Sequence, residues 1–270
     1  MAVITISRGS FSGGQLLAEC VAESLGYRVV SREVIVEAAS LYGVSEKKLV
    51  EALEKPPNFW EHFRYERRLY LAYLQAVLCE QTRGDNVVYH GHAGHLLLKG
   101  VGHVLRVRMI APLEFRVAAA MERLRLDREG AIQHVQRVDR ERTRWTKFLY
   151  GVDWADPLNY DLLLNLEHIS IEGACSLVRA AVNLSEFRTT AASQQVLEDL
   201  LLASRVRAVL ASSSGTSIAD IEVEARGEVV ILRGRLSSEE LVAEVVRLAE
   251  NVPGVRRIDR SALGLWTYTA

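Results

Sequence analysis

A glycine- and serine-rich segment near the N-terminus is the first candidate for chemistry. A strand, a loop of this kind and a helix in succession turn several backbone N–H groups and the positive end of the helix dipole toward one point. Here an apolar, β-branched stretch at Val3–Ile6 precedes the loop, and an apolar helical pattern over residues 16–25 follows it. The predicted phosphate-binding residues are Ser7, Arg8, Gly9, Ser10, Ser12, Gly13 and Gly14. The alternative is an ordinary glycine-rich turn.

The loop departs from the common phosphate-binding pattern, which ends in Gly-Lys-Ser/Thr. In that pattern the lysine contacts the transferred phosphate and the hydroxyl holds magnesium. The segment 7–14 contains no lysine. Arg8 is the candidate to replace the charge, and Ser10 or Ser12 the hydroxyl. The loop therefore predicts phosphate binding and leaves phosphoryl transfer open.

Arginines form a second group that could act on phosphate. They are Arg123, Arg125, Arg128, Arg137, Arg140, Arg142 and Arg144, on a segment with helical character. Guanidinium groups bind phosphate oxygens in pairs. Alternatively, single arginines belong to a solvated face, paired at i,i+3 or i,i+4 with Glu122, Asp127, Glu129 or Glu141. Both interpretations stay open for each arginine, and the group as a whole favours the first.

Four of the seven histidines lie close together, at His90, His92, His95 and His103. Their spacing gives no tetrahedral ligand set, and no cysteine or carboxylate lies beside them. We therefore assign no metal ligands. Structural roles or contacts to phosphate at the edge of a sheet fit these histidines better, with His92 as a candidate donor.

The elements that must position these residues alternate between strands and helices. Strands are predicted at 3–6, 86–90, 104–110 and 161–165, with a short apolar segment at 27–30. Helices are predicted at 16–25, 32–41, 59–83 and 172–187, and another starts at residue 112, runs through residue 121 and is followed by an arginine-rich helical region to about residue 145. This alternation is typical of an α/β fold in which helices wrap a parallel sheet. From residue 189 the order changes to αββαβ, with two strands joined by a turn at Arg226-Gly227-Glu228. The chain thus divides into domains at 1–188 and 189–270.

Four ordered blocks of the first domain resemble the cytidylate kinase-like family, a P-loop nucleoside monophosphate kinase type with a variant phosphate loop. The blocks are ITISRGSFSGGQLLAECVAESLGY, VVYHGHAGHLLL with VLRVRMIAPLEFRVAAAMERL, DRERTRW, and WADPLNYDLLLNLEHISIEGA. The resemblance implies transfer of the γ-phosphoryl group of ATP to CMP or a similar nucleotide, with magnesium. It also implies catalytic roles for Arg8, Arg123 and Arg142, and substrate contacts from Arg32, His92, Arg137, Asp139 and Arg142.

Three residues depart from the family pattern. Phe11 replaces a glycine of the loop, Ser31 an aspartate, and His92 an arginine. Each departure falls on an expected nucleotide contact. Three hypotheses follow: an active kinase with an attached regulatory domain, a catalytically degenerate nucleotide sensor, and a structural or membrane-surface protein.

The C-terminal segment resembles the BON domain. The resemblance rests on IEVEARGEVVILRGRLSSEELVAEVVRLAENVPGVRRI. It implies a module that binds a small molecule, a lipid or a protein, and a regulatory or assembly role is an equal alternative. We expect the apolar tail at Leu263–Tyr268 to pack against this domain or a second subunit.

The composition and the cysteines limit the expected cellular compartment and the expected binding partners of the chain. With 49% hydrophobic residues, 25% charged residues and a net charge of -1, it has the composition of a globular protein without bulk attraction to nucleic acid. Cys20, Cys79 and Cys175 are odd in number and widely spaced, which predicts free thiols in a reducing compartment. With neither a leader nor a membrane span in view, we expect a cytoplasmic protein that binds nucleotides. The aromatic segment Phe59–Tyr73 is a candidate interface for a homo-oligomer.

Overall fold

The larger domain is built on a five-stranded parallel sheet in the order β2-β3-β1-β4-β5. Our computed structural model describes residues 2–31, 33–54, 62–91, 93–213, 215–216 and 220–265. The strands are β1 (Val3–Arg8), β2 (Arg28–Val30), β3 (Val87–Tyr89), β4 (Val104–Ile110) and β5 (Leu162–Asn165). The apolar runs of β1, β3 and β4 are buried on both faces, as is typical of parallel sheets, and the edge strands β2 and β5 are partly exposed. The predicted α/β class is confirmed.

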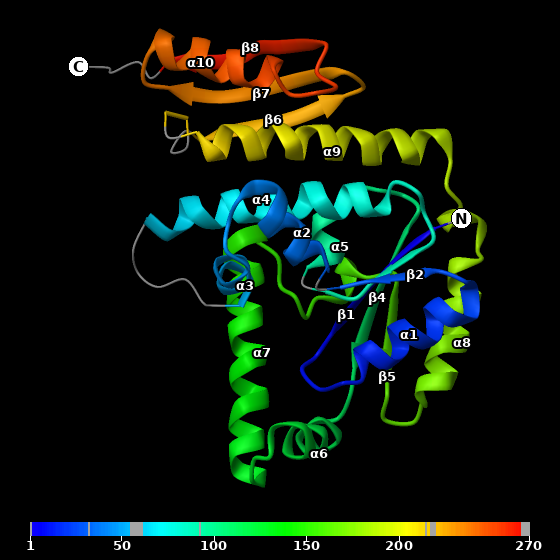
Figure 1. The fold of residues 1–270 in the computed structure, drawn as a ribbon. Coiled ribbons are helices and arrows are strands. Elements are labelled where there is room, and N and C mark those ends of the chain that lie inside the picture. The colour runs from blue at the N-terminus through cyan, green and yellow to red at the C-terminus, as the bar shows by residue number, and fades with distance from the viewer. Residues whose placement is uncertain are drawn as a thin grey trace.

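Helices cover both faces of this sheet (Figure 1). On one face, α1 (Gly14–Leu25) and α8 (Ile171–Val182) pack around Ile4 and Leu105, while on the other, α4 (His62–Thr82) packs near Val3. Adjacent residues of β1 thus enter different cores, because side chains alternate along a strand. The remaining helices on this side are α2 (Glu33–Tyr42), α3 (Glu46–Glu54) and α5 (Gly94–Leu97). Helix α3 has no counterpart among the predicted elements.

The arginine-rich segment forms two helices, α6 (Leu113–Leu124) and α7 (Arg128–Tyr150), that project beyond the sheet (Figure 1). Arg125 has φ 55° and ends α6, and Asp127 caps α7 by accepting a hydrogen bond from the Gly130 N–H at 2.9 Å. A small apolar core around Val117 and Val135 joins the two helices. We call this pair of helices the arm.

The C-terminal domain is a three-stranded sheet with two helices. Its elements are α9 (Ala191–Ser212), β6 (Ile221–Arg226), β7 (Val229–Leu236), α10 (Glu239–Glu250) and β8 (Arg257–Leu265). Two short 3₁₀ helices lie earlier in the chain: η1 (Pro157–Asn159) between α7 and β5, and η2 (Ser185–Phe187) between α8 and α9. β6 pairs with β7 antiparallel, and β8 pairs with β7 parallel. The αββαβ order is confirmed. Residues 266–268 of the apolar tail lie outside the described residues.

Helix α9 belongs to both hydrophobic cores. Leu197 and Leu201 are buried in the core that contains α4, and Val206 and Leu210 are buried in the core of the small sheet. Figure 1 shows α9 running alongside α4, with β6 and β7 on its opposite side. The helix therefore joins the two domains through packing on two of its faces.

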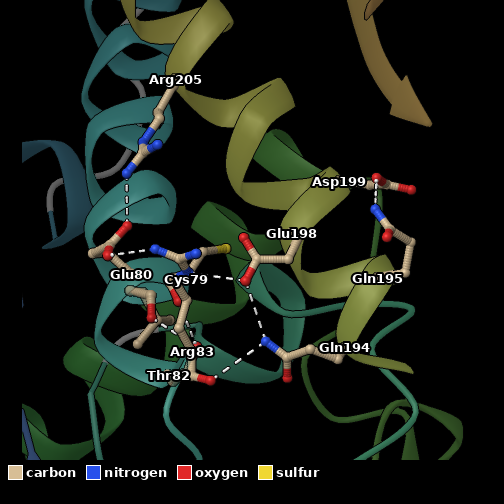
Figure 2. Close-up of polar contacts among 10 residues, drawn as sticks. Cys79, Glu80, Thr82, Arg83, Gln194, Gln195, Glu198, Asp199 and Arg205 are labelled. Carbon is tan, nitrogen blue, oxygen red and sulfur yellow. Dashed lines mark hydrogen bonds and ion pairs between the residues drawn. The ribbon is translucent and has the colours of Figure 1, made fainter. Parts of the chain in front are cut away.

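Charge pairs border this junction (Figure 2). Arg83 of α4's C-terminal end contacts Glu198 of α9 at 2.9 Å, and Arg205 of α9 contacts Glu80 of α4 at 2.7 Å. On the other side of α9, Asp199 accepts a hydrogen bond from the Gly227 N–H at 2.7 Å. Arg83 and Arg205 thus have carboxylate partners, whereas Arg207 of α9 donates to the side-chain oxygen of Gln75 in α4 at 3.1 Å.

The aromatic helix packs within the chain. Tyr73 is 2% exposed and stacks on Tyr42 with ring centroids 3.9 Å apart. Because its side chain is buried within the chain, Tyr73 cannot contribute to the homo-oligomer interface predicted for residues 59–73. Phe59 lies outside the described residues.

The prediction of free thiols is wrong for two of the three cysteines. Cys20 of α1 and Cys175 of α8 form a disulfide, with Cα atoms 6.1 Å apart and a separation of 155 positions in sequence. Their spacing could not reveal the pair, because the sheet brings α1 and α8 together. Cys79 is free, and burial raises its pKa to about 12. None of the helices in the described ranges has the length and apolar character needed to cross a membrane.

Candidate functional site

The predicted phosphate loop follows the central strand of the sheet and leads into α1. Gly13 has φ 78°, a left-handed conformation that suits glycine, and it caps the helix that begins at Gly14. The Ser12 hydroxyl is fully buried and donates to the Gly9 carbonyl at 2.9 Å. The Gly9 N–H donates to the Met109 carbonyl of β4 at 3.3 Å. The loop is therefore a built turn at the C-terminal edge of the sheet, where ligands bind in open α/β folds.

Arg8 lies across the start of α1. A Cβ atom at Gly14 would lie 2.0 Å from the Arg8 Cδ, so any larger residue here would force the Arg8 side chain to move. Position 14 is where the usual phosphate loop carries its lysine. The Arg8 side chain therefore fills the space into which a lysine side chain at position 14 would extend. Burial lowers the Arg8 pKa, as does Arg123, while Tyr89 opposes the shift.

Arg142 reaches the same place from α7. Its guanidinium donates to the Arg8 carbonyl at 2.6 Å, and its Cζ lies 5.1 Å from the centre of the Trp154 ring. The Trp154 indole N–H donates to the Ser7 hydroxyl at 2.8 Å. Ser7, Arg8, Arg142 and Trp154 line a small cavity of about 20 Å³. This volume has room for about one water molecule.

Arg108 is a buried cation beside this cavity. It is 7% exposed, stacks on Trp154 with its Cζ 4.2 Å from the ring centre, and donates to the Tyr160 hydroxyl at 3.2 Å. It also donates to the Trp154 carbonyl. Among the described residues, neither Arg8 nor Arg108 forms an ion pair with a carboxylate. Buried charges are normally paired, so this edge of the sheet is suited to an anionic ligand.

Asp139 of α7 contacts the tip of the loop. Its carboxylate accepts from the Ser10 hydroxyl at 3.2 Å and from the Ser10 N–H at 3.5 Å. The same carboxylate pairs with Arg116 of α6, whose Nε donates to the Ser10 carbonyl at 2.7 Å. The arm is thereby joined to the loop through one carboxylate and one guanidinium.

Phe11 also joins the loop to the arm. Its φ of 59° lies in the left-handed region, at the position where the family pattern has glycine. For a residue with a Cβ this conformation costs about 1–2 kcal/mol. The ring packs against the apolar core of the arm and lies 5.8 Å from the His134 ring. Packing offsets the backbone cost, and the arm is held where it covers the loop.

The remaining predicted site residues have mixed outcomes. Arg123 is exposed at the end of α6, near enough to Arg8 to lower its pKa. Arg137 is exposed and contacts Glu141 at 3.2 Å and His134 at 3.3 Å on its own helix. That pairing fits the solvated-face interpretation, and a substrate contact from Arg137 stays a prediction. Arg32 and His92 lie outside the described residues.

His90 and His95, two of the described histidines of the cluster, are buried. Burial, reinforced by Arg108, lowers the His95 pKa to about 3, and burial with Arg8 lowers the His90 pKa to about 4. Neither ring nitrogen of His95 has a hydrogen-bond partner among the described residues. No three metal-ligating side chains in the described part of the chain lie close enough to hold an ion. The two histidines add no charge to the site at neutral pH.

Sequence reasoning missed four contributors to the site. They are Arg108, Arg116, Trp154 and Tyr160. All four stand in the blocks quoted above, so the signal was present. Arg108 lies in a strand that sequence reasoning assigned only to the core.

Residues 3–168 match the profile of the cytidylate kinase-like family, and residues 198–263 match that of the BON domain. The chain belongs to the cytidylate kinase-like family. The cytidylate kinase of Ignicoccus hospitalis is 30% identical over 182 residues, which are 66% of this chain and 98% of that relative. The cytidylate kinase of Staphylothermus marinus is 27% identical over 66% of this chain and 95% of its own length. Both resemblances stated from the sequence are confirmed.

A solved structure supports the fold of the kinase-like domain. It is an uncharacterized protein from Eubacterium ventriosum, with a TM-score of 0.54 and 17% identity over 67% of this chain and 98% of that chain. This likeness concerns the fold alone. With the family match, it makes the larger domain a nucleotide-kinase-type domain of the cytidylate kinase-like family.

Proposed function

We propose that this member of the cytidylate kinase-like family transfers the γ-phosphoryl group of ATP to a nucleoside monophosphate, with CMP as the first candidate. One observation carries the proposal: Arg8 lies across Gly14, where other phosphate loops carry their lysine, and Arg142 bonds the Arg8 carbonyl. Together with buried Arg108, these residues concentrate positive charge at the start of α1. Such charge stabilises the oxygens of a transferring phosphoryl group.

Each predicted residue has a stated role in this proposal. Arg8, Arg123 and Arg142 contact the phosphates during transfer, while Arg32, His92, Arg137 and Asp139 hold the monophosphate acceptor. Phosphoryl transfer depends mainly on positioning and electrostatic stabilisation. The arm brings Asp139 and Arg142 to the loop from one helix, α7. Closing this helix over bound nucleotides would therefore orient both substrates and exclude water.

Magnesium fits the oxygen donors beside the loop. Mg²⁺ in phosphoryl-transfer sites takes one or two carboxylates in addition to phosphate oxygens. Asp139 and the Ser10 hydroxyl lie 3.2 Å apart and are the donors that would hold it, in exchange for their contacts with each other and with Arg116. The Ser12 hydroxyl is committed to the Gly9 carbonyl and suits this role less well. When bound, the ion would neutralise charge on the phosphate oxygens.

A nucleotide sensor without catalytic activity is the second candidate. The absence of a lysine from the segment 7–14 and the left-handed Phe11 both favour it, because they alter the loop that handles the transferred phosphate. In this case the C-terminal domain would respond to nucleotide binding through α9. We propose units at 1–188 and 189–270, the second a BON-like module for a small molecule, lipid or protein, in a cytoplasmic protein that could assemble with itself.

A screen of nucleoside monophosphates with ATP and magnesium tests the choice. The kinase proposal expects ADP formation that depends on one monophosphate, CMP first. Calorimetric binding of ATP without ADP formation with any acceptor would favour the sensor. No binding of ATP or of any monophosphate would contradict both.

A further inference from the structure

Trp154 contacts three elements of the site although it comes from a connecting segment. It lies between α7 and η1 and is 5% exposed. Its indole N–H donates to the Ser7 hydroxyl at the end of β1. Its carbonyl accepts from the Tyr160 hydroxyl at 3.0 Å and from Arg108 of β4. Both the ring and the backbone of Trp154 are therefore fixed against the sheet.

Two guanidinium groups lie against the Trp154 ring. The Arg108 Cζ is 4.2 Å from the ring centre and the Arg142 Cζ is 5.1 Å from it. Both distances fall within the range of cation–π attraction, which is stronger where water is excluded. Arg142 in addition donates to the Arg8 carbonyl. The ring and that carbonyl thus hold the Arg142 guanidinium at the wall of the cavity.

An aromatic ring does something here that a carboxylate could not. A carboxylate would also hold an arginine in place, but its charge would cancel part of the positive charge that a phosphate group needs. The face of an indole ring attracts a guanidinium and carries no net charge. Arg108 illustrates this, because its contacts in the described residues are an indole ring, a phenol and a carbonyl oxygen.

We infer that Trp154 is a positioning residue that places the Arg142 guanidinium for binding a nucleotide phosphate. Arg108 and Tyr160 fix Trp154, and the Trp154 ring in turn fixes Arg142 without reducing the charge of the site. This inference rests on the proposed function, since it requires a phosphate-bearing ligand. It adds a residue that acts through Arg142 and does not itself touch the ligand.

Two substitutions separate the parts of Trp154. Trp154→Phe keeps an aromatic face and loses the indole N–H, while Trp154→Leu removes the aromatic face. The affinities of wild type and Arg142→Ala for ATP with magnesium and for CMP are first compared by calorimetry. The ligand that binds Arg142→Ala more weakly is then used for the Trp154 variants. For that ligand we expect Trp154→Leu to weaken binding about tenfold and Trp154→Phe about threefold or less. Thermal unfolding checks that both variants fold.

The double variant gives the decisive measurement. If Trp154 acts through Arg142, then Trp154→Leu should weaken binding by no more than about twofold in a chain that already carries Arg142→Ala. A purely structural role would make the two losses multiply, and that result would overturn the inference. The inference would also be wrong if Arg142→Ala leaves the affinity for both ATP and CMP unchanged. A wild-type protein that binds neither ATP nor CMP would instead contradict the proposed function.

Discussion

Two regions of the molecule are rich in arginine, and they use it differently. At the junction of α4 and α9, Arg83 and Arg205 contact the carboxylates of Glu198 and Glu80 (Figure 2). At the strand ends beside the loop, the contacts of Arg8 and Arg108 within the described residues do not include a carboxylate in an ion pair. Arg108 instead uses an indole ring and hydroxyl and carbonyl oxygens.

The difference separates the carboxylate-paired arginines Arg83 and Arg205 from the cations at the strand ends. Lack of a carboxylate does not by itself mark a ligand site, since Arg207 of the junction donates to Gln75 of α4. Exposed ion pairs hold two surfaces in register with a small gain in stability. A buried guanidinium without a counter-ion costs free energy in the absence of ligand, and an anion relieves that cost. The same residue type therefore stabilises the junction at one place and prepares a binding site at the other.

The largest expected effect comes from Arg142. We predict that Arg142→Ala abolishes acceptor-dependent ADP formation, because it removes a cation from the wall of the cavity. Loss of one such electrostatic contact typically costs 10² to 10³ in kcat. Steady-state turnover with ATP, magnesium and the best acceptor measures it.

Arg205→Ala is the matched control for this experiment. It removes an arginine from the junction, where the partner is Glu80, and should leave turnover unchanged. Equal losses in the two variants would break the distinction between the regions. Unchanged turnover in Arg142→Ala would remove this residue from the mechanism.

A second prediction concerns the junction itself. Leu197 of α9 is fully buried in the core that contains α4. Leu197→Ala should therefore lower the free energy of unfolding by about 2–5 kcal/mol, since it leaves a cavity in that core. Chemical denaturation measures it, with exposed Val196→Ala on the same helix as control. A loss below 1 kcal/mol would mean that α9 does not form part of that core in solution.

Sequence reasoning gave most of the fold because the fold depends on local patterns. The largely apolar segment Val104–Ile110 and the strand–loop–helix succession at residues 3–25 can be predicted from neighbouring residues alone. Contacts between distant segments were not accessible in the same way. The pairing of Cys20 with Cys175 and the double burial of α9 arise only when the sheet brings separate helices together.

The residues of the candidate site likewise fall into those that could be predicted from the sequence and those that could not. The loop residues and Arg142 followed from glycine spacing and family blocks, and Arg142 does reach the loop. Arg108 was hidden, because an arginine within an apolar strand shows neither its burial nor its aromatic neighbours in the sequence. The role of Gly14 was hidden too, since it depends on the path of the Arg8 side chain.

A third prediction tests the electrostatics of the cationic region through pH. Burial and the nearby Arg108 lower the His95 pKa to about 3, against about 6.5 in an unfolded chain. As pH falls below about 6.5, the unfolded chain binds a proton that folded His95 does not, so the free energy of unfolding decreases by up to about 1.4 kcal/mol per pH unit. The decrease continues until pH approaches the folded pKa.

Unfolding of wild type and His95→Gln between pH 7 and 5 measures this effect. The variant should lose less stability over that interval, by about 1–2 kcal/mol. His168→Gln, at an exposed position after β5, is the control and should follow the wild type. Parallel curves for wild type and His95→Gln would show that the His95 ring is not excluded from water as described.

The smallest expected effect belongs to the ion pairs of the junction. Glu198→Gln removes the charge that contacts Arg83 at 2.9 Å, where both side chains are partly exposed. We expect a loss of only about 0.2–1 kcal/mol in the free energy of unfolding, with unchanged turnover, because exposed pairs are well solvated. Raising the ionic strength should reduce the difference from wild type, since salt screens such pairs. A loss above 2 kcal/mol that does not respond to salt would mean that the Arg83–Glu198 pair is buried in solution. The arginines of the two regions would then differ in whether they have a carboxylate partner, but not in their exposure to solvent.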